Sequence, residues 1–192
     1  YQQNDFEPVE RAPLGGPLPA DRKFVYPWVG SELLRDSFQE RVNQDQIRRT
    51  EDVLVGFNGW ARLGFATGSS GSATDAVLAS AYASDGRDLS PTQSLFGSAW
   101  ASGRYEHGEI RNGILGAEAR YYLQTSARSK FFANVSGTVT EQLDQDQQLT
   151  LGGDTGLRGY PFAYQAGTAK ALLTLEQRYY TKWYPFRLFN VA

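Results

Sequence analysis

The chain has 192 residues, of which 41% are apolar, so it is long enough to bury a single hydrophobic core. Its formal net charge of −2 gives no reason to expect nucleic-acid binding, and the absence of cysteine excludes disulfides, thiolate metal sites and a cysteine nucleophile. No apolar run approaches the roughly 18 residues of a membrane-spanning helix, so a membrane role would require a β-barrel, whose alternating strands are compatible with a mean hydropathy of −0.47. No secretory signal segment opens the sequence, which we interpret as an internal part of a longer precursor.

The first third of the chain reads as a loop followed by extended segments. Residues 1–21 contain four prolines and a glycine pair and predict a linker or loop. The segment 22–42 is extended; its part 32–42 fits a strand better than the alternative of a short helix. The clearest strand covers 51–67, because apolar side chains share one parity at Val53, Val55, Phe57, Ala61, Leu63 and Phe65.

Alternating segments continue to the end of the chain. Further strands are predicted at about 74–84, 92–105, 109–124, 130–143 and 168–180, and a last strand starts near Phe186. The first of these is expected to end in a turn at Asp85-Gly86-Arg87. A long loop is predicted at 144–167. Regular strands separated by turn signals indicate an all-β antiparallel meander, either a sandwich or a barrel.

Charged residues favour the barrel. The segments 115–122 and 173–180 echo each other in five of eight places, and each presents a carboxylate and a guanidinium on one face, Glu118 with Arg120 and Glu176 with Arg178. Charges are costly in a sandwich core, although a sandwich with these faces in solvent fits the same pattern. Short turns at 125–129 and 181–185 carry aromatic residues, as an interfacial girdle would: Tyr121, Tyr122, Phe131, Phe132, Tyr179, Tyr180, Trp183, Tyr184 and Phe186.

The most specific stretch is 149–161, LTLGGDTGLRGYP. Four glycines permit tight reversals around a single arginine, Arg158, whose planar guanidinium fits a carboxylate. With the following KALLTLEQRYY, this stretch resembles the bacterial surface-antigen superfamily of outer-membrane β-barrels, which includes the assembly factors BamA and TamA and the two-partner secretion transporters. The matching tetrad is Leu157, Arg158, Gly159 and Tyr160.

The resemblance implies a location and a role for this tetrad. In the family the tetrad lies on an extracellular loop folded into the barrel lumen, where its arginine meets an acidic residue of the wall. The family's wall acid belongs to a later F-x-D-x-G motif, which does not occur before the sequence ends at Ala192. Candidate wall partners of Arg158 within the chain are Glu118 and Glu176. The alternative is that these acids belong to a general ladder of salt bridges along the wall.

By this resemblance, residues 22–192 form part of a transmembrane β-barrel in the bacterial outer membrane, with about seven to eight strands of a larger barrel. The implied function is insertion of outer-membrane proteins or translocation of polypeptides. The implied partners are outer-membrane lipid, unfolded or nascent outer-membrane or secreted polypeptides, and the remaining barrel strands. Two alternatives stay open: a barrel that anchors or exports a fused enzyme, and a soluble β-sandwich that binds carbohydrate through Trp60, Trp100 and tyrosines.

Catalytic patterns are absent from the sequence. His107 is the only histidine, which excludes a histidine-based metal site of usual ligand count, and it is expected in a solvated turn. No G-x-S-x-G motif occurs, and Gly152-Gly153 with Gly156 lacks the lysine of a phosphate-binding loop. We therefore predict that the chain is not an enzyme and uses no metal or cofactor.

Overall fold

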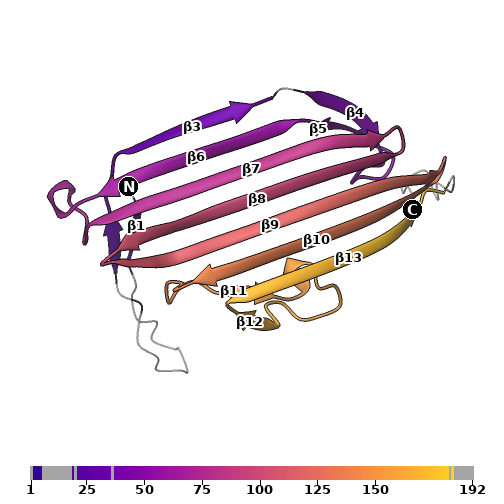
Figure 1. Cartoon of the computed structure of the whole chain (residues 1–192). Helices are drawn as coiled ribbons and strands as arrows, with labels where there is room; N and C mark the ends of the chain where they lie inside the picture. Colours follow the sequence, from indigo (N-terminus) through magenta and orange to yellow (C-terminus); the bar gives the residue numbers. More distant parts are fainter. Residues whose placement is uncertain (1, 6–18, 20, 36, 182, 184–192) are drawn as a thin grey trace.

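The chain folds around one large antiparallel sheet. The structure, a computed structural model, describes residues 2–5, 19, 21–35, 37–181 and 183. Seven strands pair in the order β13-β10-β9-β8-β7-β6-β3 (Figure 1). Their bounds are β3 Trp28–Leu34, β6 Phe57–Ala66, β7 Ala76–Ser90, β8 Gln93–Glu106, β9 Glu109–Ser126, β10 Ser129–Glu141 and β13 Ala169–Tyr179. Since β3 and β13 have no second neighbour within the described residues, the sheet is open there and does not close into a barrel.

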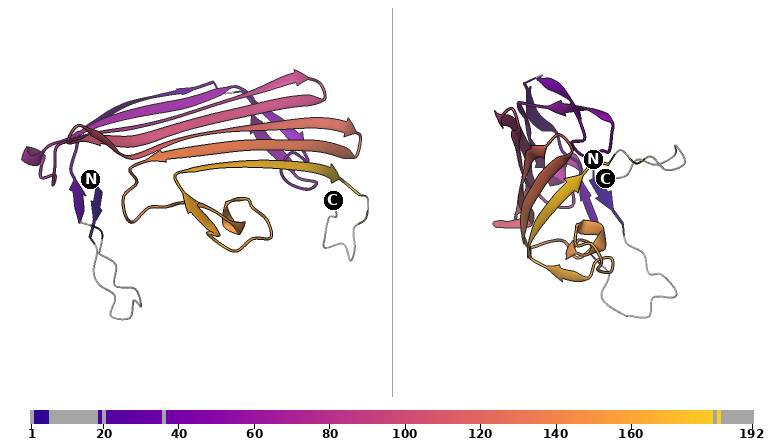
Figure 2. Two further views of the ribbon diagram at one scale, coloured as in Figure 1. Left: turned by 60° about the horizontal axis from the view of Figure 1, so that its bottom comes forward. Right: turned by 90° about the vertical axis from the view of Figure 1, so that its right-hand side faces the viewer.

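Three small two-stranded sheets accompany the principal sheet. They are β1 (Gln2–Asn4) with β2 (Arg22–Phe24), β4 (Phe38–Val42) with β5 (Thr50–Leu54), and β11 (Leu149–Leu151) with β12 (Gln165–Gly167). Two short 3-10 turns, η1 (Gly68–Ser70) and η2 (Gly153–Thr155), complete the described elements. The principal sheet curves, and all three small sheets lie on its concave side (Figure 2). Among the described residues, no helix is long and apolar enough to cross a membrane.

The two faces of the principal sheet differ in chemistry. Alternate residues of β13 point to opposite faces, so Leu173 and Leu175 lie on the convex face, where they are 64% and 60% exposed, while Glu176 and Arg178 face the concave side. Other large apolar side chains are exposed on the convex face: Leu63, Phe65, Leu95, Tyr105, Ile110, Leu115, Val135 and Val139. The alternation predicted from the sequence is confirmed. The small sheets lie on the polar, concave face and leave the apolar, convex face uncovered.

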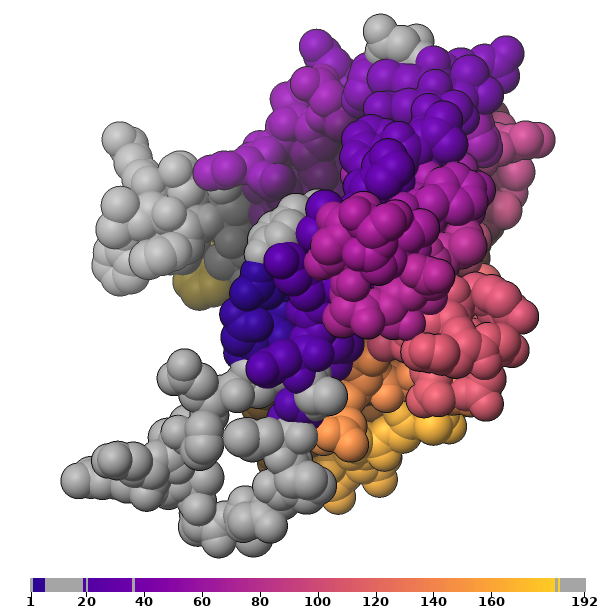
Figure 3. All heavy atoms as spheres, turned by 90° about the vertical axis from the view of Figure 1, so that its left-hand side faces the viewer, coloured from indigo at the N-terminus to yellow at the C-terminus, as the bar shows by residue number. Residues whose placement is uncertain are grey.

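Buried apolar side chains form two separate clusters on the concave side. One contains Phe24, Ala66 and Ala76 and lies beneath the β1–β2 sheet, whose atoms have the darkest indigo colour in Figure 3. The other contains Phe96, Tyr122 and Phe132, whose rings meet edge-on at 5.8 Å and tilted at 5.0 Å between centroids. Val53 and Val55 of the β4–β5 segment cover this second cluster. Each cluster therefore forms where a small two-stranded sheet covers part of the principal sheet.

The all-β class and the seven strands of the principal sheet agree with the sequence prediction, whereas one turn does not. The predicted turn at Asp85-Gly86-Arg87 is wrong, because β7 continues through it to Ser90. Gly86 is a strand glycine that makes room for an aromatic ring: a Cβ there would lie 2.6 Å from Cδ1 of Phe96. The sequence Asp85-Gly86-Arg87 resembles a turn, but its glycine is required for close packing against a neighbouring strand.

Two other predictions need correction. The single strand predicted over 51–67 is divided into β5 and β6, which are separated at Gly56 with φ +149°. The linker predicted over 1–21 includes β1, which pairs with β2; residues 6–18 and the strand expected near Phe186 lie outside the described residues. Strand rather than helix is confirmed for the described part of 32–42, although β4 leaves the principal sheet to pair with β5.

Three aromatic side chains lie in register across the middle of the concave face. Trp60 pairs with Tyr82 in the strand register, and Tyr82 pairs with Trp100. The rings of Trp60 and Tyr82 stack with centroids 6.5 Å apart. The indole of Trp100 lies flat over its cross-strand neighbour Gly116, where an added Cβ would overlap the ring.

We therefore expect Gly116→Ala to displace the indole of Trp100. The free energy of unfolding should fall by about 1–3 kcal/mol, because overpacking forces side chains out of their preferred rotamers. Near-UV circular dichroism should show the loss of tryptophan signal. Gly137→Ala is the matched control, since its Cβ would meet only the carbonyl of Lys170 at 3.8 Å. An unchanged near-UV spectrum for Gly116→Ala would contradict the packing described.

Candidate functional site

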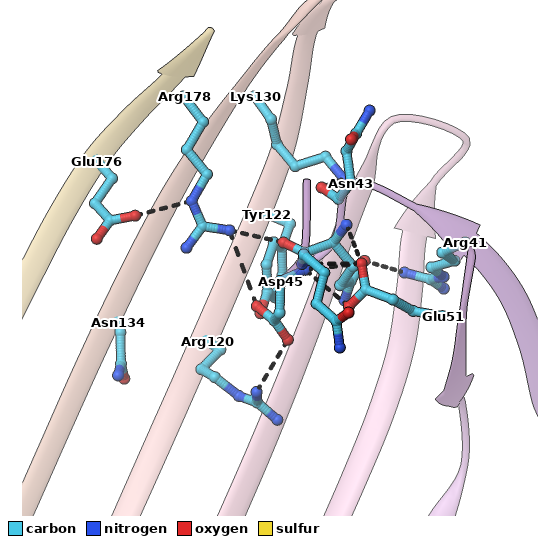
Figure 4. A network of polar contacts seen from close by, with 12 residues as sticks. Arg41, Asn43, Asp45, Glu51, Arg120, Tyr122, Lys130, Asn134, Glu176 and Arg178 are labelled. Carbon is cyan, nitrogen blue, oxygen red and sulfur yellow. Dashed lines mark hydrogen bonds and ion pairs between the residues drawn. The ribbon is translucent and has the colours of Figure 1, made fainter. Parts of the chain in front are cut away.

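The tip of the β4–β5 hairpin, residues 43–49, lies on the concave face against β9, β10 and the end of β13 (Figure 4). Its main-chain carbonyls accept hydrogen bonds from the sheet. Asn43 O accepts from Lys130 Nζ and from Tyr180 Oη, each at 2.9 Å, and Gln44 O accepts from Arg178 Nη1 at 2.7 Å. Three donors from the sheet side therefore hold two successive carbonyls of the tip.

The carboxylate of Asp45 makes the next contacts. It accepts a hydrogen bond from Tyr122 Oη at 2.8 Å and forms ion pairs with Arg120 at 3.7 Å and Arg178 at 3.9 Å. The two arginines come from the two echoing segments of the sequence, which lie on β9 and β13 and present them to the same face. We call Arg120, Tyr122, Lys130, Arg178 and Tyr180 the seat of the hairpin tip.

Glu51 fixes the shape of the tip from within. Its carboxylate accepts hydrogen bonds from the backbone N–H groups of Gln44, Asp45 and Gln46 at 2.9, 3.0 and 3.1 Å. Asn43 has a left-handed φ of +61°, and its Oδ1 accepts from the backbone N–H of Arg48 at 2.6 Å. A carboxylate that receives several backbone donors is held strongly, so the tip presents its carbonyls to the seat in a preformed geometry.

The stem of the hairpin is fastened by Arg41. Its Nη2 donates to Asp88 Oδ1 at 2.6 Å and its Nη1 donates to Ser94 Oγ at 2.8 Å. The same guanidinium lies 5.5 Å from the centroid of the Phe96 ring. Charge, hydrogen bonding and aromatic contact thus combine where the hairpin crosses β7 and β8.

Arg158 lies next to this network. Its Nη2 is 3.0 Å from Glu176 Oε1, and the other oxygen of Glu176 accepts a hydrogen bond from Arg178 Nε at 2.8 Å. A continuous series of charges therefore runs from Arg158 through Glu176 and Arg178 to Asp45. The Arg158 side chain is 83% exposed and that of Glu176 is 20% exposed, so solvent screens the outer pair more than the inner one.

The other residues of the tetrad shape the loop. Leu157 donates its backbone N–H to Gly152 O at 3.0 Å, and Gly159 takes a φ of +86°. Tyr160 packs against Tyr164 with ring centroids 5.0 Å apart. Of the two acids considered as partners, Glu176 lies beside Arg158, whereas Glu118 accepts a hydrogen bond from Asn134 at 2.8 Å. The role of this pair stays a prediction.

A second group of charges secures the start of the same loop. Arg104 is 9% exposed and donates two hydrogen bonds to Asp144, at 2.7 and 2.6 Å, while its guanidinium lies over the ring of Phe24. Arg22 of β2 reaches both Asp144 and Asp146. Burial by itself would raise the pKa of Asp146, but its hydrogen bonds from Arg22, from the backbone and from Asn4, together with the positive charge of Arg22, outweigh this and hold the pKa below its ordinary value. The β1–β2 sheet and the Arg158 loop are thereby joined.

The seat residues Lys130 and Tyr180 and the tip residues Asp45 and Glu51 were not expected from the sequence. A signal was present, because Asn43 and its polar neighbours separate two extended segments, which is typical of a hairpin. What the sequence could not indicate is that this hairpin bends onto the sheet. His107 lies in the predicted turn, with Nε2 3.2 Å from Thr74 Oγ1.

No family model, curated protein or solved structure matches this chain. The resemblance in the Arg158 loop therefore stays a prediction. Within the part of the chain that the structure describes, no group of three or more His, Asp or Glu side chains is placed to hold a metal ion. The arrangement offers cationic and phenolic donors directed at carbonyls and carboxylates, which is the chemistry of polypeptide recognition.

Replacing Glu51 with glutamine should loosen the hairpin tip, because an amide is a weaker acceptor for three backbone donors than a carboxylate. A charge-assisted hydrogen bond contributes about 1.5–3 kcal/mol, so losing part of it should make local opening of the hairpin tip roughly tenfold faster. Trypsin cleavage after Arg48 and Arg49 would report this opening. Asp52→Asn is the matched control, being the next, solvent-exposed acid of the same strand. Equal cleavage of both variants would contradict the role given to Glu51.

Proposed function

We propose that the chain forms part of the wall of a surface-antigen-type β-barrel in the bacterial outer membrane, which takes part in inserting outer-membrane proteins or in translocating polypeptides. The observation that carries this proposal is the contrast between the two faces of one sheet. The convex face presents exposed apolar side chains, and the concave face gathers arginines, carboxylates and hydroxyls. Alternation of this kind suits strands with lipid outside and a polar lumen inside.

Strand length supports the proposal. A transmembrane β-strand needs about 9–11 residues. Six neighbouring strands of the sheet meet this length, with 10 residues in β6, 15 in β7, 14 in β8, 18 in β9, 13 in β10 and 11 in β13. Large exposed apolar side chains on such strands would be unfavourable in water at about 25 cal/mol per Å². Lipid contact removes this cost.

The sheet edges support a larger barrel. Within the described residues β3 and β13 each pair on one side only. In a bilayer, unpaired backbone donors and acceptors cost several kcal/mol each, so both edges would have to pair with further strands. The partners proposed for this wall are therefore outer-membrane lipid on the convex face, additional barrel strands at both edges, and unfolded polypeptides on the concave face.

The Arg158–Glu176 pair supports the assignment of the loop. A loop arginine that reaches a concave-face carboxylate fits the pairing implied for the tetrad, and we call the Arg158–Glu176 pair the latch. The latch would act through geometry more than through energy, because solvent screens a pair whose arginine is 83% exposed. By holding the loop against β13, it would keep lumen and wall in the arrangement needed for transport.

Two alternative functions are supported by fewer features of the structure. The same wall would serve a barrel that anchors a fused enzyme, which the sequence preceding Tyr1 in the full-length protein would reveal. The row of Trp60, Tyr82 and Trp100 favours a carbohydrate-binding β-sandwich, since stacked rings on a polar face suit sugars. A sandwich would require a cover for the convex face, and no second sheet lies over that face among the described residues.

In the full-length protein, we expect Arg158→Ala to leave the protein in the outer membrane but to lower assembly or transport several-fold, because the loop loses a contact with β13 that contributes up to about 1 kcal/mol at this exposure. Glu176→Gln should give the same defect. Arg87→Ala is the control, because the Arg87 side chain is 77% exposed and pairs only locally, with Asp85. If Arg158→Ala is present in the membrane at the normal level and has wild-type activity, the role proposed for the latch is wrong.

A further inference from the structure

The seat is built to recognise a peptide, and in this structure the peptide is the chain's own hairpin tip. Lys130, Tyr180 and Arg178 donate to the carbonyls of two successive residues. Tyr122, Arg120 and Arg178 then receive the carboxylate of the residue that follows. The hydrogen bonds from the seat to residues 43 and 44 go to the main chain. The seat thus recognises two peptide carbonyls followed by an acid.

The charge balance of the seat calls for a carboxylate from its occupant. Arg120, Lys130 and Arg178 contribute three cations, and with the tip in place Lys130 is only 7% exposed. The adjacent acid on the sheet, Glu176, is shared between Arg178 and Arg158. Without the carboxylate of Asp45, the three cations would be left with Glu176 as the adjacent acid, which is unfavourable because like charges repel one another.

The tip is held in a way that permits replacement. It belongs to the separate β4–β5 sheet, and it is held by polar contacts with side chains of the seat and by a hydrogen bond from Arg48 Nη2 to Thr181 O, just after β13. Asp45 is 47% exposed in its place on the seat. Beside it is a cavity of about 620 Å³ whose lining includes Asp45, Ile47, Arg158, Glu176 and Arg178. An incoming segment can therefore approach the seat past Arg158, with cations along its path.

We propose that the seat is a docking site for a segment of another polypeptide that carries an Asp or Glu in an extended or turn conformation, and that the hairpin tip is its built-in competitor. The inference rests on the proposed function in one respect: polypeptides handled on the concave face would supply the segment. An Asp or Glu two residues after the first bound carbonyl is the recognised feature. Displacement of the tip by such a segment would couple substrate arrival to the Glu176–Arg158 pair.

The test uses the whole chain in detergent micelles and a fluorescent peptide of residues 41–51, RVNQDQIRRTE. Asp45→Asn in the chain weakens the internal competitor while leaving the seat intact. We expect this variant to bind the peptide at least tenfold more tightly than the unaltered chain does. Fluorescence anisotropy measures the binding, and far-UV circular dichroism confirms that each variant keeps its β structure.

Two sets of controls test the recognition itself. A peptide carrying Asp45→Asn should bind at least tenfold more weakly, and a peptide carrying Val42→Ala should bind as well as the parent, because the Val42 side chain is 55% exposed. Adding Arg120→Gln and Arg178→Gln to the Asp45→Asn chain should abolish binding. Adding Arg87→Gln instead should leave binding unchanged.

Equal binding of the parent peptide and the peptide carrying Asp45→Asn, or no binding to a folded Asp45→Asn chain, would overturn the proposal. Binding that survives loss of both seat arginines would also overturn it, by placing the peptide elsewhere. These results are independent of transport: the micelle experiment measures docking alone, whereas the Arg158→Ala experiment measures activity in the membrane. Failure of one is therefore distinguishable from failure of the other.

Discussion

The structure depends on neutralising guanidinium groups on one face of a single-layer sheet. A lone sheet cannot bury its own charges, so partners must come from segments that fold back over it. Arg104 obtains Asp144 from the loop that follows β10, and Arg178 obtains carbonyls and a carboxylate from the β4–β5 hairpin. The β4–β5 hairpin also covers the cluster of Phe96, Tyr122 and Phe132, and Arg104 lies over Phe24 of the other cluster, so charge pairing and apolar burial occur side by side.

This constraint explains why the Arg158 loop and the hairpin tip, which are far apart in sequence, meet on β13. Glu176 and Arg178 are adjacent concave-face residues of one strand, and each serves a different covering segment. A change at one segment therefore reaches the other through two neighbouring side chains. On the proposed function, loop position and occupancy of the seat would be linked by this short path, with β13 as the rigid element between them.

The period-two pattern was sufficient to predict the antiparallel meander and the seven strands of the principal sheet, because alternation is a local property of each strand. The pattern predicted the wrong role for residues that contact a partner distant in the sequence. Gly86 looked like a turn but accommodates the ring of Phe96, and Tyr122, expected in an aromatic rim, is buried beneath the hairpin. Sequence spacing offered Glu118 and Glu176 equally as partners of Arg158; only the path of the loop places Glu176 beside it. The seat was missed for the same reason, since its residues converge from separate strands onto a hairpin that is distant in sequence.

On the proposed function, the convex face contacts lipid and the concave face contacts water, and cysteine labelling tests this contrast most directly. The chain contains no cysteine, so single cysteines can be placed at positions 171–175 of β13 in the full-length protein, reconstituted in lipid vesicles and exposed to a water-soluble maleimide. The account predicts labelling at 172 and 174 and protection at 171, 173 and 175. Faster labelling at 171, 173 and 175, the positions that are more exposed in the isolated chain, would show that water covers the convex face and would contradict the account.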